Sequence, residues 1–232
     1  MSRRQDSHHT ITPEMVLRAY SIGIFPMAES AEDPSLHWVE PQKRGIIPLD
    51  SLYISKSLAK LVRSDRFSIE IDSDFNAVIE ACATTHGSTW INSRIRELFG
   101  ELFDLGYVHT VEVYEQGKLV GGLYGLALGG AFFGESMFHT ARDASKVALV
   151  HLVARLNAGG FTILDAQFIT PHLASLGAIE IDRSEYQKRL AHAINTEGDF
   201  GLWPKTKPRS GREALQVIDQ FRKVIPKQPE AC

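Results

Sequence analysis

The chain has 232 residues, 44% of them hydrophobic and 23% charged, a composition typical of a soluble globular protein. Its two cysteines, Cys82 and Cys232, support neither a disulfide framework nor a thiolate metal site, so a reducing compartment such as the cytoplasm is expected. The formal net charge of −3 excludes a broadly basic nucleic-acid binder, and any polyanion must therefore bind at a local basic patch.

The first predicted element is a short helix. Thr12 suits its N-cap, Pro13 suits its first turn, and Gly23 marks its end. The four prolines that follow over the next stretch do not allow long regular structure. The pattern predicts a small, irregular N-terminal domain over residues 1–55, in which Trp38 either forms the packing centre or stacks on a ligand.

The central residues 56–204 are predicted to form the main domain. Their periodicity predicts helices and strands that lead into an antiparallel meander, at residues 57–66, 67–71, 74–83, 92–105, 108–114, 118–128 and 131–138. Six glycines fall between Gly121 and Gly134. Because glycine weakens strands, this density indicates bulges or the close approach of another backbone or a ligand.

The rest of this domain begins with a helix that Asp143 opens. Its amphipathic pattern predicts one buried stripe, and its free N-terminal amides suit either capping by Asp143 or an anion. Two more strands follow, at 161–168 and 179–181, with a short helix between them. The order resembles a GCN5-related N-acyltransferase core, an α+β fold with a mixed, mainly antiparallel sheet. The turn that holds the coenzyme A pyrophosphate in such enzymes is missing, which indicates another acyl donor.

Residues 205–232 are predicted to form a basic C-terminal tail, which either binds a polyanion or is a loose, solubilising end. A second basic patch lies along the first predicted helix of the main domain. An ordinary solvent-exposed helix face is the simpler interpretation of this patch. Its members are Lys56, Lys60, Arg63 and Arg66. No apolar run approaches the length of a membrane span, and no signal peptide is predicted.

Two apolar strands each contain an acid, and these are the best candidates for chemistry. Two-residue periodicity places Phe133, Glu135 and Met137 on one face of the first strand. It places Asp165 and Gln167 together on one face of the second. Burying an unpaired carboxylate costs several kcal/mol, so these acids are expected to be partnered, neutralised or beside a cleft. A purely structural network of buried carboxylates explains the pattern equally well.

Eight blocks of the sequence resemble the leucyl/phenylalanyl-tRNA–protein transferase family. They occur in order between Thr12 and Leu190, and they are Gly23-Ile-Phe-Pro26, Arg44-Gly-Ile-Ile-Pro-Leu-Asp50, Thr89-Trp-Ile91, Val120-Gly-Gly-Leu-Tyr-Gly125, Gly134-Glu-Ser-Met-Phe138, Asp143-Ala-Ser-Lys146, Asp165-Ala-Gln167 and His172-Leu-Ala-Ser-Leu-Gly-Ala178. One departure is Met27, which stands where a tryptophan often follows the proline.

The resemblance implies a cytoplasmic monomer in which a small N-terminal domain lies on an acyltransferase-like domain. It implies transfer of leucine or phenylalanine, with methionine left open, from aminoacyl-tRNA to proteins that begin with Arg or Lys. The product is marked for proteolysis by the N-degron pathway. No cofactor, metal or membrane is implied, because an aminoacyl ester is already activated and needs only alignment and proton transfer.

The same resemblance assigns roles to the three polar residues. Asp165 and Gln167 are expected to orient and activate the incoming α-amino group, and Glu135 to hold the aminoacyl end. A carboxamide is scarcely basic, so Asp165 is the expected polariser and Gln167 the positioner. The ribose at the tRNA 3′ end remains an alternative carrier of the proton.

An apolar pocket is expected to select the donor, because leucine and phenylalanine share hydrophobicity but no hydrogen-bonding group. Its candidate walls are Phe133, Met137, Leu152 and Leu164. The terminal adenosine needs a stacking surface, for which Trp38 and Trp90 match the tryptophan-bearing blocks of the family.

Two other classes of function remain open at this point. One is a small-molecule N-acyltransferase that uses a thioester donor. The other is a tRNA-binding module without catalysis.

Overall fold

The computed structural model describes residues 11–85, 89–203 and 209–222. Within these ranges the elements run in the order α1 (Pro13–Ser21), β1 (Phe25–Met27), β2 (His37–Val39), β3 (Lys43–Ile47), α2 (Lys56–Arg63), β4 (Ser68–Ile71), α3 (Phe75–Thr84), α4 (Ser93–Asp104), β5 (Val108–Glu115), β6 (Lys118–Leu128), β7 (Ala131–His139), α5 (Ala144–Ala158), β8 (Ile163–Gln167), α6 (Pro171–Ala174), β9 (Ile179–Asp182), α7 (Arg183–Ile194) and α8 (Gly211–Phe221). Among these helices, none has the length and hydropathy that a bilayer span requires.

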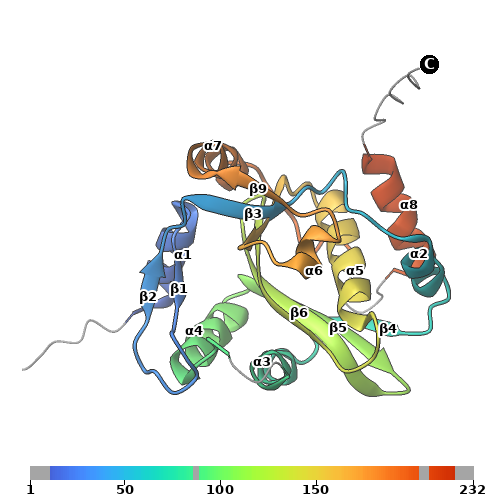
Figure 1. Ribbon diagram of the computed structural model, residues 1–232, viewed down its shortest axis with the longest axis horizontal. Coiled ribbons are helices and arrows are strands. Elements are labelled where there is room, and N and C mark those ends of the chain that lie inside the picture. The colour runs from blue at the N-terminus through green and yellow to red at the C-terminus, as the bar shows by residue number, and fades with distance from the viewer. Residues whose placement is uncertain (1–10, 86–88, 204–208, 223–232) are drawn as a thin grey trace, which may run out of the picture.

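A seven-stranded sheet in the order β4-β5-β6-β7-β8-β3-β9 forms the centre of the molecule (Figure 1). Neighbouring strands pair antiparallel except β7 and β8, which are parallel. Helices α2, α5 and α8 enclose one hydrophobic cluster against the sheet, and α1, α3, α4 and α7 enclose another. The α+β class and the mixed, mainly antiparallel sheet are therefore confirmed.

The N-terminal segment is more regular than its prolines suggest. Thr12 caps α1 as predicted, because its hydroxyl accepts from the Met15 amide at 3.4 Å. Strand β3 lies within the main sheet between β8 and β9, although the sequence predicted an irregular unit up to residue 55. Ile46 and Ile47 explain its position, because each is buried in a different one of the two hydrophobic clusters.

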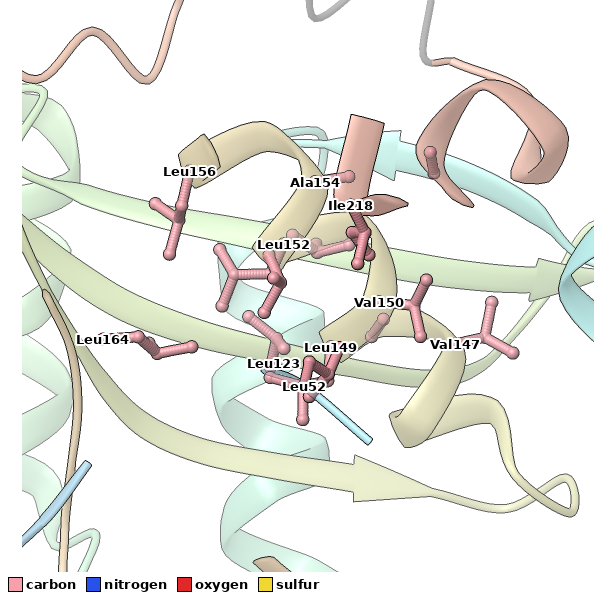
Figure 2. Packing of buried hydrophobic residues seen from close by; sticks show 14 of the residues in the cluster. Leu52, Leu123, Val147, Leu149, Val150, Leu152, Ala154, Leu156, Leu164 and Ile218 are labelled. Carbon is pink, nitrogen blue, oxygen red and sulfur yellow. The ribbon is translucent and has the colours of Figure 1, made fainter. Parts of the chain in front are cut away.

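Helix α5 is buried on nearly all sides, so the prediction of a single buried stripe is wrong. Figure 2 shows the aliphatic side chains of α5, among them Leu149, Leu152 and Leu156, with Ile218 of α8 in the same cluster. Asp143 makes no side-chain cap at the start of α5, and its carboxylate instead binds the Lys146 ammonium at 2.7 Å.

Helix α8 corrects the prediction of a loose tail. It packs on α5 and α2, and Ile218 on it is completely buried. Ser210 begins the helix with a capping box to Glu213. The remaining basic positions of the predicted tail, Lys205, Lys207, Lys223 and Lys227, lie outside the described residues.

Candidate active site

A cavity of about 330 Å³ opens between the N-terminal segment and the strands β6, β7 and β8. Its walls are mainly apolar, and they are formed by Phe25, Pro26, Met27, Ile47, Trp90, Leu123, Tyr124, Gly134, Glu135, Ser136, Met137, Leu149, Leu152, Leu164, Asp165, Ala166, Gln167, Phe168, Thr170 and Leu173. The structure thus brings Glu135, Asp165 and Gln167 together in one wall. The parallel pairing of β7 and β8 places them side by side.

Glu135 is only partly buried, and two side chains hold one of its oxygens. The Tyr20 hydroxyl donates to Oε1 at 2.8 Å, and the Gln167 side-chain amide donates to the same oxygen at 3.4 Å. Neither bond engages Oε2. Burial raises the pKa of Glu135 to about 8, against the Tyr20 hydrogen bond, which lowers it. A carboxyl group with a pKa near neutrality is well suited to accept a proton.

A β-bulge positions Glu135. Gly125 pairs with Gly134 while Tyr124 pairs with Ser136, so Glu135 is an extra residue in β7. The density of glycines predicted such a bulge, and this prediction is confirmed. A Cβ atom at Gly125 would collide with the Phe133 carbonyl oxygen and the Phe132 ring, so the bulge depends on glycine there.

The bulge also overturns one assignment. Because it breaks the two-residue alternation, Phe133 and Met137 point to opposite faces of the sheet. Phe133 is completely buried against Tyr20, with ring centroids 4.9 Å apart. It is not among the residues that line the cavity, so its place in the predicted pocket wall is wrong.

Asp165 is completely buried and fully engaged. Arg44 donates to both of its oxygens, with Nε 2.9 Å from Oδ1 and Nη2 2.7 Å from Oδ2. The Tyr186 hydroxyl donates to Oδ2 at 2.5 Å, and the backbone N–H of Gln167 donates to Oδ1 at 2.8 Å. Sequence reasoning missed Tyr20, Arg44 and Tyr186. The one available signal was that two buried acids require partners.

Gln167 adopts a left-handed backbone conformation with φ of 53°, which non-glycine residues rarely do. Its neighbour on β3 is Gly45, where a Cβ would approach the Phe168 carbonyl carbon to 2.9 Å. This turn at the end of β8 directs the Gln167 side chain to Glu135 and leaves Phe168 47% exposed at the cavity.

The other predicted residues divide between cavity and surface. Met137, Leu152, Leu164 and Trp90 line the cavity as expected. Trp38 does not line it: it pairs with Pro26 across the β1–β2 hairpin and is 40% exposed, so it is not a packing centre either. In the part of the chain that the structure describes, no group of three or more His, Cys, Asp or Glu is placed to hold a metal ion.

Comparison with known proteins assigns the family. The model of leucyl/phenylalanyl-tRNA protein transferase matches residues 46–191, and the model of the N-terminal domain of the same proteins matches residues 9–42. The chain belongs to the leucyl/phenylalanyl-tRNA–protein transferase family. The break between the two family matches falls beside Lys43, where β3 begins.

Individual members of the leucyl/phenylalanyl-tRNA–protein transferase family match over nearly their whole length. The transferase of Rhodopseudomonas palustris (strain TIE-1) is 56% identical over 220 residues, which cover 94% of this chain and 98% of that protein. The transferase of Afipia carboxidovorans is 55% identical over 221 residues, covering 94% and 97%.

Solved structures resemble this family member only distantly. The C-terminal domain of a putative lysylphosphatidylglycerol synthetase from Agrobacterium fabrum is 11% identical with a TM-score of 0.39, covering 91% of this chain and 70% of that one. A GCN5-related N-acetyltransferase-like protein from Streptococcus suis is 14% identical with a TM-score of 0.28, covering 80% and 63%.

Proposed function

We propose that this chain transfers leucine or phenylalanine from aminoacyl-tRNA to the α-amino group of proteins. The observation that carries the proposal is a cavity with an apolar interior and a polar edge at Glu135 and Gln167, in a chain 56% identical to a named transferase along nearly its full length. In the reaction the amine nitrogen attacks the ester carbonyl carbon, and a C–N bond forms while the C–O bond to the tRNA ribose breaks. The nitrogen loses one proton and the ribose oxygen gains one.

Glu135 is the proposed proton acceptor. Its Oε2 is not used by Tyr20 or Gln167, and its raised pKa brings its titration close to that of an N-terminal amine. Gln167 is the proposed positioner, because its amide nitrogen donates to Glu135 and its carbonyl oxygen is a possible acceptor for the amine. Asp165 was the expected polariser, but its bonds to Arg44, Tyr186 and Gln167 favour an indirect role.

The donor is proposed to bind in the apolar part of the cavity. Met137, Leu152 and Leu164 contact the leucine or phenylalanine side chain, and flexible Met137 adapts to both shapes. Trp90 stacks on the terminal adenosine. Trp38 is exposed and offers a further ring on β2, opposite Pro26 of β1, which reaches the cavity.

The acceptor and the setting of the reaction belong to the same proposal. We infer proteins with N-terminal Arg or Lys as acceptors, and products marked for N-degron proteolysis, from the resemblance to the family. A monomeric enzyme in the cytoplasm, without a cofactor and away from membranes, is inferred on the same basis.

A transfer assay tests this function. The purified chain is incubated with Leu-tRNA, Phe-tRNA or Met-tRNA and a peptide that begins with Arg or Lys, and the same peptides with acetylated N-termini serve as controls. Transfer of Leu or Phe to the free peptides alone is expected. Acylation from coenzyme A thioesters without transfer from tRNA supports a thioester N-acyltransferase instead. Binding of charged tRNA without any transfer supports the non-catalytic module.

A further inference from the structure

We propose that Arg44 and Tyr186 are positioning residues of the transfer reaction, which hold Asp165 as a buried counter-ion rather than as a base. Through Asp165 they fix the backbone of Gln167 and balance the charge beside Glu135. This inference rests on the proposed function.

Arg44 has the geometry of a fixed support. Its side chain is 1% exposed, and it binds Asp165 through Nε and Nη2. Its Nη1 donates to the Gly23 carbonyl oxygen at 3.1 Å. The guanidinium also lies between two rings, 4.6 Å from the centroid of Phe25 and 4.7 Å from that of Tyr186. A planar cation with its donors and faces occupied in this way is held in one orientation.

Asp165 transmits this orientation to Gln167. Its Oδ1 accepts from the backbone N–H of Gln167 two residues along the chain, and this bond supports the left-handed conformation of Gln167. That conformation in turn brings the Gln167 side-chain amide within 3.4 Å of Glu135 Oε1. Loss of the Asp165 acceptor would therefore allow the Gln167 backbone to leave this conformation, and the Gln167 side-chain amide would no longer be held beside Glu135.

The contacts of Asp165 argue against a role as base. A general base must present a free lone pair to the proton that it removes. Both oxygens of Asp165 accept from Arg44, one also accepts from Tyr186 and the other from Gln167, and the residue is completely buried. An incoming amine would have to displace these donors.

The ion pair also acts on Glu135. The groups that face Glu135 are Tyr20 from α1, Tyr124 from β6, Arg44 from β3 and Asp165 from β8. Asp165 raises the pKa of Glu135 and Arg44 lowers it. While the ion pair is intact, these two effects on the Glu135 pKa therefore oppose each other. Removal of one member alone should move the titration of Glu135, and removal of both should move it little.

A double-mutant cycle tests the inference. Arg44→Gln and Asp165→Asn each leave an uncompensated buried charge, and each is expected to lower kcat by about 100-fold or more and to lower Tm. The double variant Arg44→Gln/Asp165→Asn carries no charge at either position. The carboxamide at position 165 still offers an oxygen to the backbone N–H of Gln167. This double variant should recover Tm and at least about tenfold of the lost kcat. A double variant with recovered Tm but the kcat of Asp165→Asn would show that Asp165 is the base.

Tyr186→Phe supplies a test that does not depend on the folding of the charge variants. It keeps the ring beside Arg44 and removes only the hydroxyl that donates to Asp165. The negative charge of Asp165 then acts more strongly on Glu135, so the midpoint of the pH–kcat profile should move to higher pH while KM for charged tRNA stays within about twofold. Tyr107→Phe, at the exposed position just before β5, is the matched control and should leave the profile unchanged.

An unchanged profile in Tyr186→Phe, or a shift to lower pH, contradicts the inference. The titration of the acceptor amine is the same in every variant. A difference between variants in the midpoint of the pH–kcat profile is therefore due to a group of the enzyme. An inactive wild-type chain contradicts the proposed function instead, whereas an active wild type with an unrecovered double variant contradicts this inference alone.

Discussion

The two carboxylates of the cavity wall occupy contrasting environments, although they lie on adjacent strands. Asp165 meets a cation and several donors, whereas Glu135 receives hydrogen bonds from Tyr20 and Gln167 on a single oxygen, Oε1. Pairs of acids whose surroundings differ in this way commonly divide positioning and proton transfer between them. At the scale of single residues, this contrast supports Glu135, rather than Asp165, as the proposed proton acceptor.

Glu135→Gln is expected to abolish most of the activity. The substitution keeps the shape of the side chain but removes the proton acceptor, so kcat should fall by roughly 100- to 10,000-fold while the affinity for charged tRNA changes little. In the wild type, kcat should rise with pH through about 8, because only the deprotonated form of Glu135 accepts a proton. Rapid-quench transfer assays across pH check both points. A variant with wild-type kcat would remove Glu135 from the mechanism.

Sequence reasoning identified Glu135, Asp165 and Gln167 but none of their partners. Tyr20 lies 115 positions from Glu135, and Arg44 lies 121 positions from Asp165, so no local periodicity connects them. Arg44 stands in a block that resembles the family, yet nothing in its flanking residues indicates an ion pair. Such contacts follow from the sheet order, which places β3 next to β8.

At the scale of elements, the bulge in β7 decides which side chains reach the cavity. The meander and the presence of a bulge were predictable from alternation and glycine density. Its exact register was not, because it depends on the fit of Gly125 against Phe132 and Phe133 across the strand pair. A one-residue change of register reverses the face of every later side chain in the strand.

Gly125→Ala should therefore disturb both the strand and the site. The added methyl group would overlap the Phe133 carbonyl oxygen and the Phe132 ring, which should lower the free energy of unfolding by about 1–3 kcal/mol. Transfer should also fall because Glu135 moves. Urea unfolding and the transfer assay measure the two effects. Gly100→Ala in α4, with its nearest neighbour 3.8 Å away, is the control and should be neutral or stabilising.

Helix α8 was also open to prediction. Ser210 and Glu213 have the spacing of a capping box before an apolar run, a local signal that marks a helix start. The all-round burial of α5 was not predictable, because it requires knowledge that α8 returns to cover the helix face assigned to solvent. Local signals thus found the elements, and long-range packing decided their exposure.

Ile218→Ala tests whether α8 is part of the folded unit. Ile218 is completely buried beside α5, and its truncation should lower the free energy of unfolding by about 2–5 kcal/mol. The pH dependence of transfer should remain that of the wild type, since Ile218 is not among the residues that line the cavity. Val217→Ala, a less buried neighbour, should cost less. Equal and small effects of both substitutions would mean that α8 is not firmly packed.

At the scale of the whole molecule, the N-terminal segment is part of the site. Tyr20, Gly23, Phe25 and Arg44 all precede the main domain in the chain, yet they contact Glu135 or the support of Asp165. The sequence predicted a small N-terminal domain over residues 1–55. It did not predict that this segment provides a strand of the central sheet and the partners of both acids.

The charge distribution of the molecule should make tRNA binding sensitive to salt. The average charge is negative, but the four basic residues on and after α2, from Lys56 to Arg66, are all exposed. The logarithm of the association constant should fall linearly with the logarithm of salt concentration, and Lys60→Glu should make the slope shallower by about one. Lys118→Glu, at the exposed first residue of β6, is the control. Affinity independent of salt would argue against tRNA as donor.

The buried pair of Arg44 and Asp165 has a consequence for how related chains diverge. A change of one partner alone leaves the other charge buried without a counter-ion, so a lineage that loses either charge is expected to lose the other as well. Positions 44 and 165 are thus expected to change together among related chains. A relative with a neutral residue at one of them should have a neutral residue at both.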